Sequence, residues 1–245
     1  MFSKSVYGMI QVFVIGLLAV QTPALGAETS SETSIPNIYF NRMAVAPFLV
    51  GRHQPHMDES LDDTLSCPLN QVCEADPSIA PDAGEMLQTM VQSALKERYG
   101  GQVVPTDQVQ AAYVDMRLDG TKDSPRTLAL EMGKRLSADL ILVGTVWRYR
   151  DRGAIEGFPD RPASVAFALY LVDAPSGRQL WRGVFDMTQE TVLRDMARFS
   201  ERIRMGLKWL SADELARYGV KSVFRTFPTN IKPLALKPTD GGTAR

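Results

Sequence analysis

The chain has 245 residues, of which 44% are hydrophobic and 22% charged, and this composition excludes a disordered, collagen-like or disulfide-dense chain. The formal net charge of −1 argues against a general nucleic-acid-binding protein, because such proteins are strongly basic. Two histidines and two cysteines leave few candidates for histidine-based catalysis or for a thiolate metal site. We therefore expect one medium-sized domain with extensions at its ends.

Residues 1–27 have the pattern of a secretory signal peptide. Lys4 is the only charged residue in this segment, an apolar run covers 9–20, and small residues precede a cleavage site after Ala27. The alternative is a transmembrane anchor, but the apolar run is shorter than the roughly 20 residues that a membrane-spanning helix needs. No cysteine lies near the cleavage site, so the sequence predicts a periplasmic protein without a lipid anchor, peripheral to a membrane at most.

The next segments predict a flexible leader, a strand, a loop and a helix. The leader covers 28–37, and a strand follows within 38–50, where Pro47 indicates either an edge position or the end of the strand. The loop 51–81 shows no periodicity and is unusually long for a compact domain. Asp82 is expected to cap the following helix, because Glu85 lies three residues later at the spacing of a capping box.

The middle of the chain predicts alternating helices and strands. A short strand is expected over 102–105, a helix from Thr106 or Asp107 to Met116, and a helix from Ser124 to Leu136 with proline at its first position. A long strand follows over 139–150, buried at its start and half exposed at its end. Alternation should place Val146, Arg148 and Arg150 on one face of this strand, and Thr145, Trp147 and Tyr149 on the other.

The last third predicts an antiparallel hairpin followed by helices. Strands over 164–172 and 178–189 are joined by a turn at 173–177 that contains Pro and Gly. Helices are expected over 192–207 and from Ser211, and 228–245 should be a disordered tail. The fold class is therefore α/β, or more strictly α+β: one domain over 38–227 with a single mixed sheet, helices packed on it, and an antiparallel hairpin and helices at its end.

Every histidine and cysteine of the chain lies between residues 53 and 73. His53, His56, Cys67 and Cys73 have the ligand types of a tetrahedral zinc site, although the spacing of the cysteines is poor for one. The favoured interpretation is a Cys67–Cys73 disulfide, because such bonds form and persist in exported proteins. Free or intermolecular thiols are the third alternative. We accordingly predict no metal and no cofactor.

Motifs for catalysis are missing from the sequence. There is no Gly-x-Ser-x-Gly elbow, and no glycine-rich phosphate motif follows a strand. We therefore expect a protein that is not an enzyme, with a hydrolase that uses carboxylates alone as the remaining alternative. Arginines gather at the end of the strand 139–150 and in the loop after it, beside two aromatic residues, which are residue types enriched at interfaces. The candidate partner surface comprises Trp147, Arg148, Tyr149, Arg150, Arg152 and Arg161. The alternative is a solvated arginine face above core aromatics.

Three segments resemble a group of bacterial envelope proteins. They are Met43-Ala-Val-Ala-Pro-Phe48, then Gly133-Lys-Arg-Leu-Ser-Ala-Asp-Leu-Ile-Leu-Val-Gly144, and Asp173-Ala-Pro-Ser-Gly-Arg-Gln-Leu-Trp181. In this order they are similar to segments of the proteins grouped around LpoB, CsgG and the TolB amino-terminal domain. The resemblance implies a mixed sheet with helices and a role without catalysis in the cell envelope. The chain departs from the group in having no lipidation cysteine and no clear pore-forming hairpin.

These observations lead to one expected function and several alternatives. We expect a periplasmic adaptor or regulator that binds an envelope protein, as LpoB-like proteins do in peptidoglycan synthesis. The runner-up is an accessory subunit of an outer-membrane export or surface-assembly system. A metal-binding protein that uses His53, His56, Cys67 and Cys73 is a further alternative. No nucleic-acid partner is expected, and the sequence leaves the oligomeric state open.

Overall fold

A computed structural model describes residues 36–53, 66–116, 124–153, 162–189 and 210–234. The predicted signal peptide and the predicted helix over 192–207 lie outside these ranges, as do His56 and Arg161. Within the described residues, no helix is both long enough and apolar enough to cross a bilayer.

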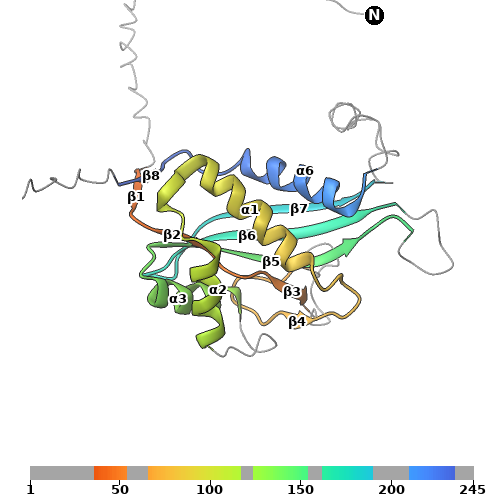
Figure 1. The fold of residues 1–245 in the computed structure, drawn as a ribbon, viewed down its shortest axis with the longest axis horizontal. Coiled ribbons are helices and arrows are strands. Elements are labelled where there is room, and N and C mark those ends of the chain that lie inside the picture. Colours follow the sequence, from red (N-terminus) through yellow and green to blue (C-terminus); the bar gives the residue numbers. More distant parts are fainter. Residues whose placement is uncertain (1–35, 54–65, 117–123, 154–161, 190–209, 235–245) are drawn as a thin grey trace, which may run out of the picture. The chain divides into compact units, whose positions relative to one another are not determined.

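A mixed sheet forms the centre of the fold, as the sequence predicts (Figure 1). Its strand order is β4-β3-β5-β6-β7, and β2 pairs with β5 as well. The strands β2 and β3 run parallel to β5, whereas β6 and β7 form the antiparallel hairpin. The bounds are β2 Met43–Val45, β3 Leu49–Arg52, β4 Glu74–Ala75, β5 Leu140–Arg150, β6 Ser164–Asp173 and β7 Gln179–Thr188.

The predicted first strand is divided at Pro47. In β2 the residue Met43 lies opposite Leu140, whereas in β3 Leu49 lies opposite Thr145, so one extra residue is accommodated between the two strands. Proline has no backbone N–H and cannot donate to the ladder, which explains why pairing stops at this position. The sequence therefore placed the end of a strand correctly, but not the second strand that follows it.

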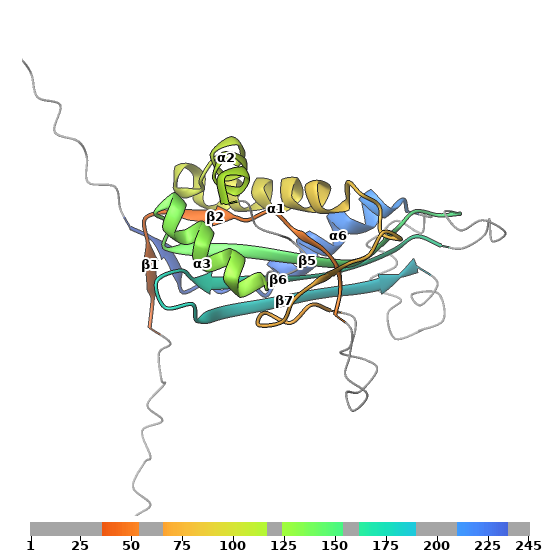
Figure 2. The same cartoon turned by 90° about the horizontal axis from the view of Figure 1, so that it is seen from below.

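Helices cover both faces of the sheet. Figure 1 shows α1 (Ala83–Tyr99) and α6 (Ala212–Phe224) side by side on one face, where Leu87, Leu215 and Phe167 share one core. The helices α2 (Thr106–Met116) and α3 (Pro125–Leu136) pack on the other face around Met132 and Tyr170. Figure 2 presents the same elements after a turn of 90°. The two cores are separated by the sheet.

The predicted N-cap positions are confirmed for α1, α3 and α6, but the predicted capping hydrogen bonds are present only for α3 and α6. Ser124 and Ser211 have extended backbones, and each accepts a hydrogen bond from the amide three residues later, at 3.2 Å in both cases. Glu214 completes the capping box by accepting from the amide of Ser211 at 3.0 Å. Asp82 instead has helical dihedrals, φ −90° and ψ −5°, and its side chain makes no capping bond. The predicted capping box at Asp82 was therefore wrong, because a capping side chain needs an extended backbone to reach the amides.

The strand predicted over 102–105 is not found in the structure. Residues Gly100–Gln102 form a turn of 3₁₀ helix, η1, and Val103 makes an isolated parallel bridge to Met43. The amide of Val104 donates to the carbonyl of Met43 at 2.8 Å. This segment therefore contacts the edge of β2 through single bonds and forms no ladder.

The domain extends past the predicted boundary at residue 227. The strand β1 (Ile38–Phe40) pairs in parallel with β8 (Ile231–Pro233), forming a second, two-stranded sheet. Ile231 is 2% exposed and belongs to the core on the α1 side. The prediction of a disordered tail over 228–245 was thus wrong for its first residues. The strand β8 has three residues, of which one is buried, and so short a segment cannot show the periodicity of a strand.

Candidate interaction surface

A β-bulge at the end of β5 decides which way the predicted surface residues face. The register passes from Val146 opposite Phe167 directly to Arg148 opposite Ala166, so Trp147 is the extra residue. In a bulge two residues oppose one, and the alternation of faces shifts by one position beyond it. Trp147 and Arg148 consequently lie on the α2–α3 face, whereas Tyr149 lies on the α1–α6 face. The predicted alternation was wrong beyond the bulge, because Tyr149 does not share the face of Trp147 and Arg148 does not share the face of Val146.

The two aromatic residues of the predicted surface are core residues. Trp147 is 3% exposed and belongs to the core on the α2–α3 face, and Tyr149 is 6% exposed in the core on the α1–α6 face. The hydroxyl of Tyr149 donates to Oδ1 of Asp213, in the first turn of α6, at 2.5 Å. Burial, and then this hydrogen bond and the negative charge of Asp213, raise the pKa of Tyr149 well above its usual value. Neither ring is available as an anchor for a partner.

The arginines of the predicted surface are more accessible than the aromatic residues. Arg148 reaches across β6 to form an ion pair with Asp186 of β7, and the side chain of Asp186 stays 48% exposed. Arg150 is partly exposed, and Arg152 is exposed in the loop after β5. The backbone that carries Arg148 and Arg150 is held by its pairing with β6, opposite Ala166 and Ser164, since the pairing of β5 with β3 ends at Val146.

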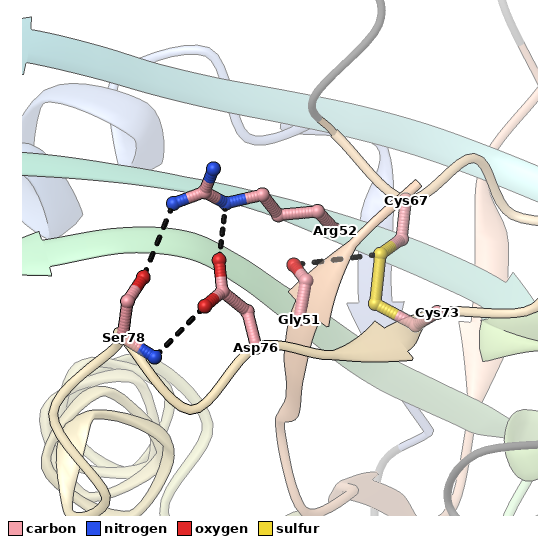
Figure 3. A network of polar contacts seen from close by, with 6 residues as sticks. All are labelled: Gly51, Arg52, Cys67, Cys73, Asp76 and Ser78. Atoms are coloured by element: carbon pink, nitrogen blue, oxygen red, sulfur yellow. Dashed lines mark hydrogen bonds and ion pairs between the residues drawn. A yellow bond between two sulfur atoms is a disulfide. The ribbon is translucent and has the colours of Figure 1, made fainter. Parts of the chain in front are cut away.

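A second ion pair, absent from the sequence predictions, lies beside this strand end. Nε of Arg52, the last residue of β3, lies 2.5 Å from Oδ2 of Asp76, and its Nη2 donates to Oγ of Ser78 at 3.3 Å (Figure 3). The amide of Ser78 donates to Oδ1 of Asp76 at 2.8 Å. Hydrogen bonding from Ser78, with smaller contributions from the charges of Arg52 and Arg150, holds the pKa of Asp76 below its usual value. Burial opposes this shift and is outweighed.

The disulfide predicted between Cys67 and Cys73 is present, and it holds the segment before Asp76 against the sheet. The sulfur of Cys67 lies 3.7 Å from the carbonyl oxygen of Gly51 (Figure 3). The carbonyl of Cys67 accepts a hydrogen bond of 2.9 Å from the hydroxyl of Tyr170. A side chain at Gly51 would meet the carbonyl oxygen of Glu74 at 2.0 Å. This close approach requires glycine and allows β4 to pair with β3.

The zinc alternative loses its thiolate ligands in this structure. Both sulfurs are used in the disulfide, so neither is a thiolate that could bind a metal. His53 is partly buried directly after β3, and His56 lies outside the described ranges. Within those ranges, no three or more His, Cys, Asp or Glu side chains gather in a way that could hold a metal ion.

Together these residues form a polar surface around the end of β5, which we call the arginine end and define as Arg52, Arg148, Arg150 and Arg152. Val50 lies opposite Val146 in the ladder, and both side chains face the α1–α6 core. Arg52, two residues after Val50, keeps that face, whereas the bulge turns Arg148 to the α2–α3 face, so the arginine end surrounds the end of the sheet from both faces. Guanidinium groups are always charged and bind carboxylates through paired N–H groups. Such a surface is suited to bind a partner that carries carboxylates. Sequence reasoning missed Arg52 because the aperiodic loop 51–81 gave no sign of which residues return to the sheet.

The residues that carried the family resemblance have structural roles. Oδ2 of Asp139 accepts bonds from the amides of Asn41 at 2.6 Å and Arg42 at 3.1 Å, which fixes the turn between β1 and β2. The ring of Phe48 lies over Gly144, where an added Cβ would be 2.3 Å from it. A Cβ at Gly133 would meet Ala174 at 2.4 Å. These positions preserve close packing between elements and do not form a site.

Comparison with known proteins gives matches among solved structures. No known family model matches the chain, and no curated protein sequence matches it. The chain is similar to the PelC dodecamer from Paraburkholderia phytofirmans, with 14% identity over 82% of this chain and 96% of that one and a TM-score of 0.42. It is similar to lipoprotein GNA1162 from Neisseria meningitidis, with 14% identity, 68% and 94% coverage and a TM-score of 0.40.

The predicted resemblance to LpoB is found among these solved structures too. Escherichia coli LpoB matches with 11% identity over 76% of this chain and 87% of that chain, at a TM-score of 0.35. The structural neighbours thus include LpoB, as the sequence motifs indicated. Identities this low and TM-scores below 0.5 assign no partner or activity to this chain.

Proposed function

We propose that this protein is a non-catalytic adaptor or regulator in the periplasm, and that the arginine end binds an acidic surface of an envelope protein. The observation that carries the proposal is the presence of Arg148 and Arg150 at the end of β5 and of Arg52 at the end of the neighbouring strand β3, which together surround one end of the sheet. Arginine on a rigid backbone loses less conformational freedom on binding than arginine on a loose loop, and it is enriched at binding hot spots.

Within the described ranges, several reactive side chains make structural contacts, which supports a role in binding and not in catalysis. The cysteines form a disulfide, Tyr149 and Asp213 join the sheet to α6, and Ser211 and Glu214 cap that helix. Each of these groups satisfies a structural requirement of the fold. The disulfide, together with the predicted signal peptide, supports the periplasm as the compartment.

Chemical crosslinking followed by affinity capture from envelope extracts tests the proposal. We expect an envelope protein to be enriched with the purified protein, and Arg150→Glu to reduce its capture about tenfold, because reversing a contacting charge costs at least the ~1.4 kcal/mol that tenfold represents. The matched control is Arg178→Glu, since Arg178 is also exposed but lies in the β6–β7 turn at the other end of the hairpin. Capture by this control should equal that of the parent protein.

Two results would contradict the proposal. One is that no envelope protein is enriched, and the other is that Arg150→Glu and Arg178→Glu reduce capture equally. The identity of a captured protein then separates a regulator of peptidoglycan synthesis from an accessory subunit of an export system.

A further inference from the structure

The outer edge of β7 has no partner strand among the described residues. This edge extends over Gln179–Thr188, which is long for an edge strand. Natural edges are usually protected by proline, by charged side chains or by a bulge, because an open edge is a template for another strand. The middle of β7 contains no proline or bulge, and its two exposed charges, Arg182 and Asp186, have opposite signs. Val184 at its centre is 43% exposed.

The backbone groups of Val184 point toward this open edge. The amide of Gln189 donates to the carbonyl of Ala163 at 3.1 Å, so Gln189 forms a hydrogen-bonded pair with the β6 side. Hydrogen-bonded and non-bonded pairs alternate along an antiparallel ladder. Counting back from Gln189, the N–H and C=O groups of Asp186, Val184 and Arg182 are therefore directed away from β6, and no strand of the described ranges pairs with them.

The charges on this edge are symmetric about Val184. Arg182 lies two residues before it and Asp186 two residues after it, and all three side chains are exposed on the same face. If two β7 strands pair antiparallel with Val184 opposite Val184, each Arg182 lies opposite Asp186 of the other copy. Registers centred on Arg182 or Asp186 place like charges opposite each other, which is unfavourable. Asp186 can accept the additional contact because its side chain is 48% exposed despite its ion pair with Arg148.

We propose that β7 is a self-association edge, through which two copies of this chain pair antiparallel about a two-fold axis at Val184. The pairing joins the two main sheets into one continuous sheet and removes both open edges. It brings two valines into contact and forms two Arg182–Asp186 pairs between the copies. The partner is thus a second copy of the same chain, because the charge pattern of the strand is complementary to itself.

Sedimentation velocity of the purified protein over a range of concentrations tests this pairing. We expect a reversible dimer. Val184→Glu places two carboxylates opposite each other at the axis, and its dimer dissociation constant should rise at least about tenfold. The matched control is Val114→Glu, because Val114 is also an exposed valine, 64% exposed on α2, and lies away from the β7 edge. This control should dimerise like the parent protein, and circular dichroism should show that both variants are folded.

Crosslinking through a single introduced cysteine tests the register. Val184→Cys should form a covalent dimer under mild oxidation, since each residue 184 lies opposite its counterpart, whereas Val114→Cys should not. A parent protein that stays monomeric at all concentrations would overturn the proposal, and so would a dimer that Val184→Glu leaves intact. These measurements use the purified chain without any envelope extract, so their outcome is separate from that of the capture experiment.

Discussion

At the scale of single residues, the hydroxyl of Tyr149 is a polar group in the α1–α6 core that joins the sheet to a helix. It connects the end of β5 to the first turn of α6 through a hydrogen bond of 2.5 Å to Asp213. The sequence left Tyr149 open as either an interface residue or a core aromatic, and the structure confirms the second. The face on which it lies was predicted wrongly, because a bulge leaves no mark in the sequence. The arginines beside it were identified correctly as accessible residues, since their charge alone opposes burial.

Replacing Tyr149 by Phe should lower the free energy of unfolding at pH 7 by about 1.5–3 kcal/mol, because a hydrogen bond to a charged group is lost. The pKa of Tyr149 in the folded chain lies above its usual value of 10.0, so its stabilisation is fully present below pH 10. That stabilisation is lost as the pH rises through the folded pKa. Urea unfolding at pH 7 and above pH 10 should therefore show a shallower alkaline loss of stability in the variant.

The control for this experiment is Tyr39→Phe, because Tyr39 is 58% exposed. We expect its stability at pH 7 to match that of the parent protein. An alkaline profile of Tyr149→Phe that coincides with the parent profile would contradict the assigned role.

At the scale of elements, local signals predicted the structure well where they were strong. The hairpin turn, the Ser124-Pro125 helix start and the Ser211–Glu214 capping box are each determined by a few neighbouring residues. The signals failed at the 3₁₀ turn before Val103, and at Asp82 they predicted the start of the helix but not the absence of its capping bond. The pairing of Arg52 with Asp76 likewise depends on the disulfide-closed segment returning to β3, and no sequence pattern specifies that return.

Reducing the Cys67–Cys73 disulfide should lower the free energy of unfolding by about 2 kcal/mol, the chain-entropy value for so short a loop. The native contacts of Cys67 with Tyr170 and Gly51 do not require the bond itself, so the reduced protein should still fold. Thermal unfolding with and without a reductant measures the difference. The double variant Cys67→Ser, Cys73→Ser is the control and should not respond to the reductant. Equal stability of the oxidised and reduced protein would contradict this prediction.

At the scale of the whole molecule, β1 and β8 join the beginning and the end of the described domain. Ile38 lies opposite Ile231, and the rings of Phe40, Tyr99 and Phe227 pack beside this pair. The overall class of fold was predicted from the alternation of strands and helices, but this pairing was not. The paired residues of these two strands are 193 positions apart in the sequence, and each strand has only three residues, so nothing local indicates that they meet.

Ile231→Ala should lower the free energy of unfolding by about 2–4 kcal/mol, because a buried isoleucine side chain is lost and a cavity remains. Lys232→Ala, at the exposed neighbouring position of β8, should change it by less than about 0.5 kcal/mol. Chemical denaturation of both variants measures the two effects. Equal stabilities would mean that β8 is not part of the cooperative unit.

The parallel direction of β1 and β8 has a mechanical consequence. The chain enters β1 beside Pro36 and leaves β8 at Leu234, so the two connections depart from opposite ends of one short ladder. Tension applied between these two connections would slide the strands past each other, loading the bonds Ile38 to Asn230 and Leu234 to Phe40 at the same moment. A ladder strained in shear resists rupture better than one that is peeled open bond by bond. The two-stranded sheet of this fold is therefore oriented to resist tension between its two connections in shear.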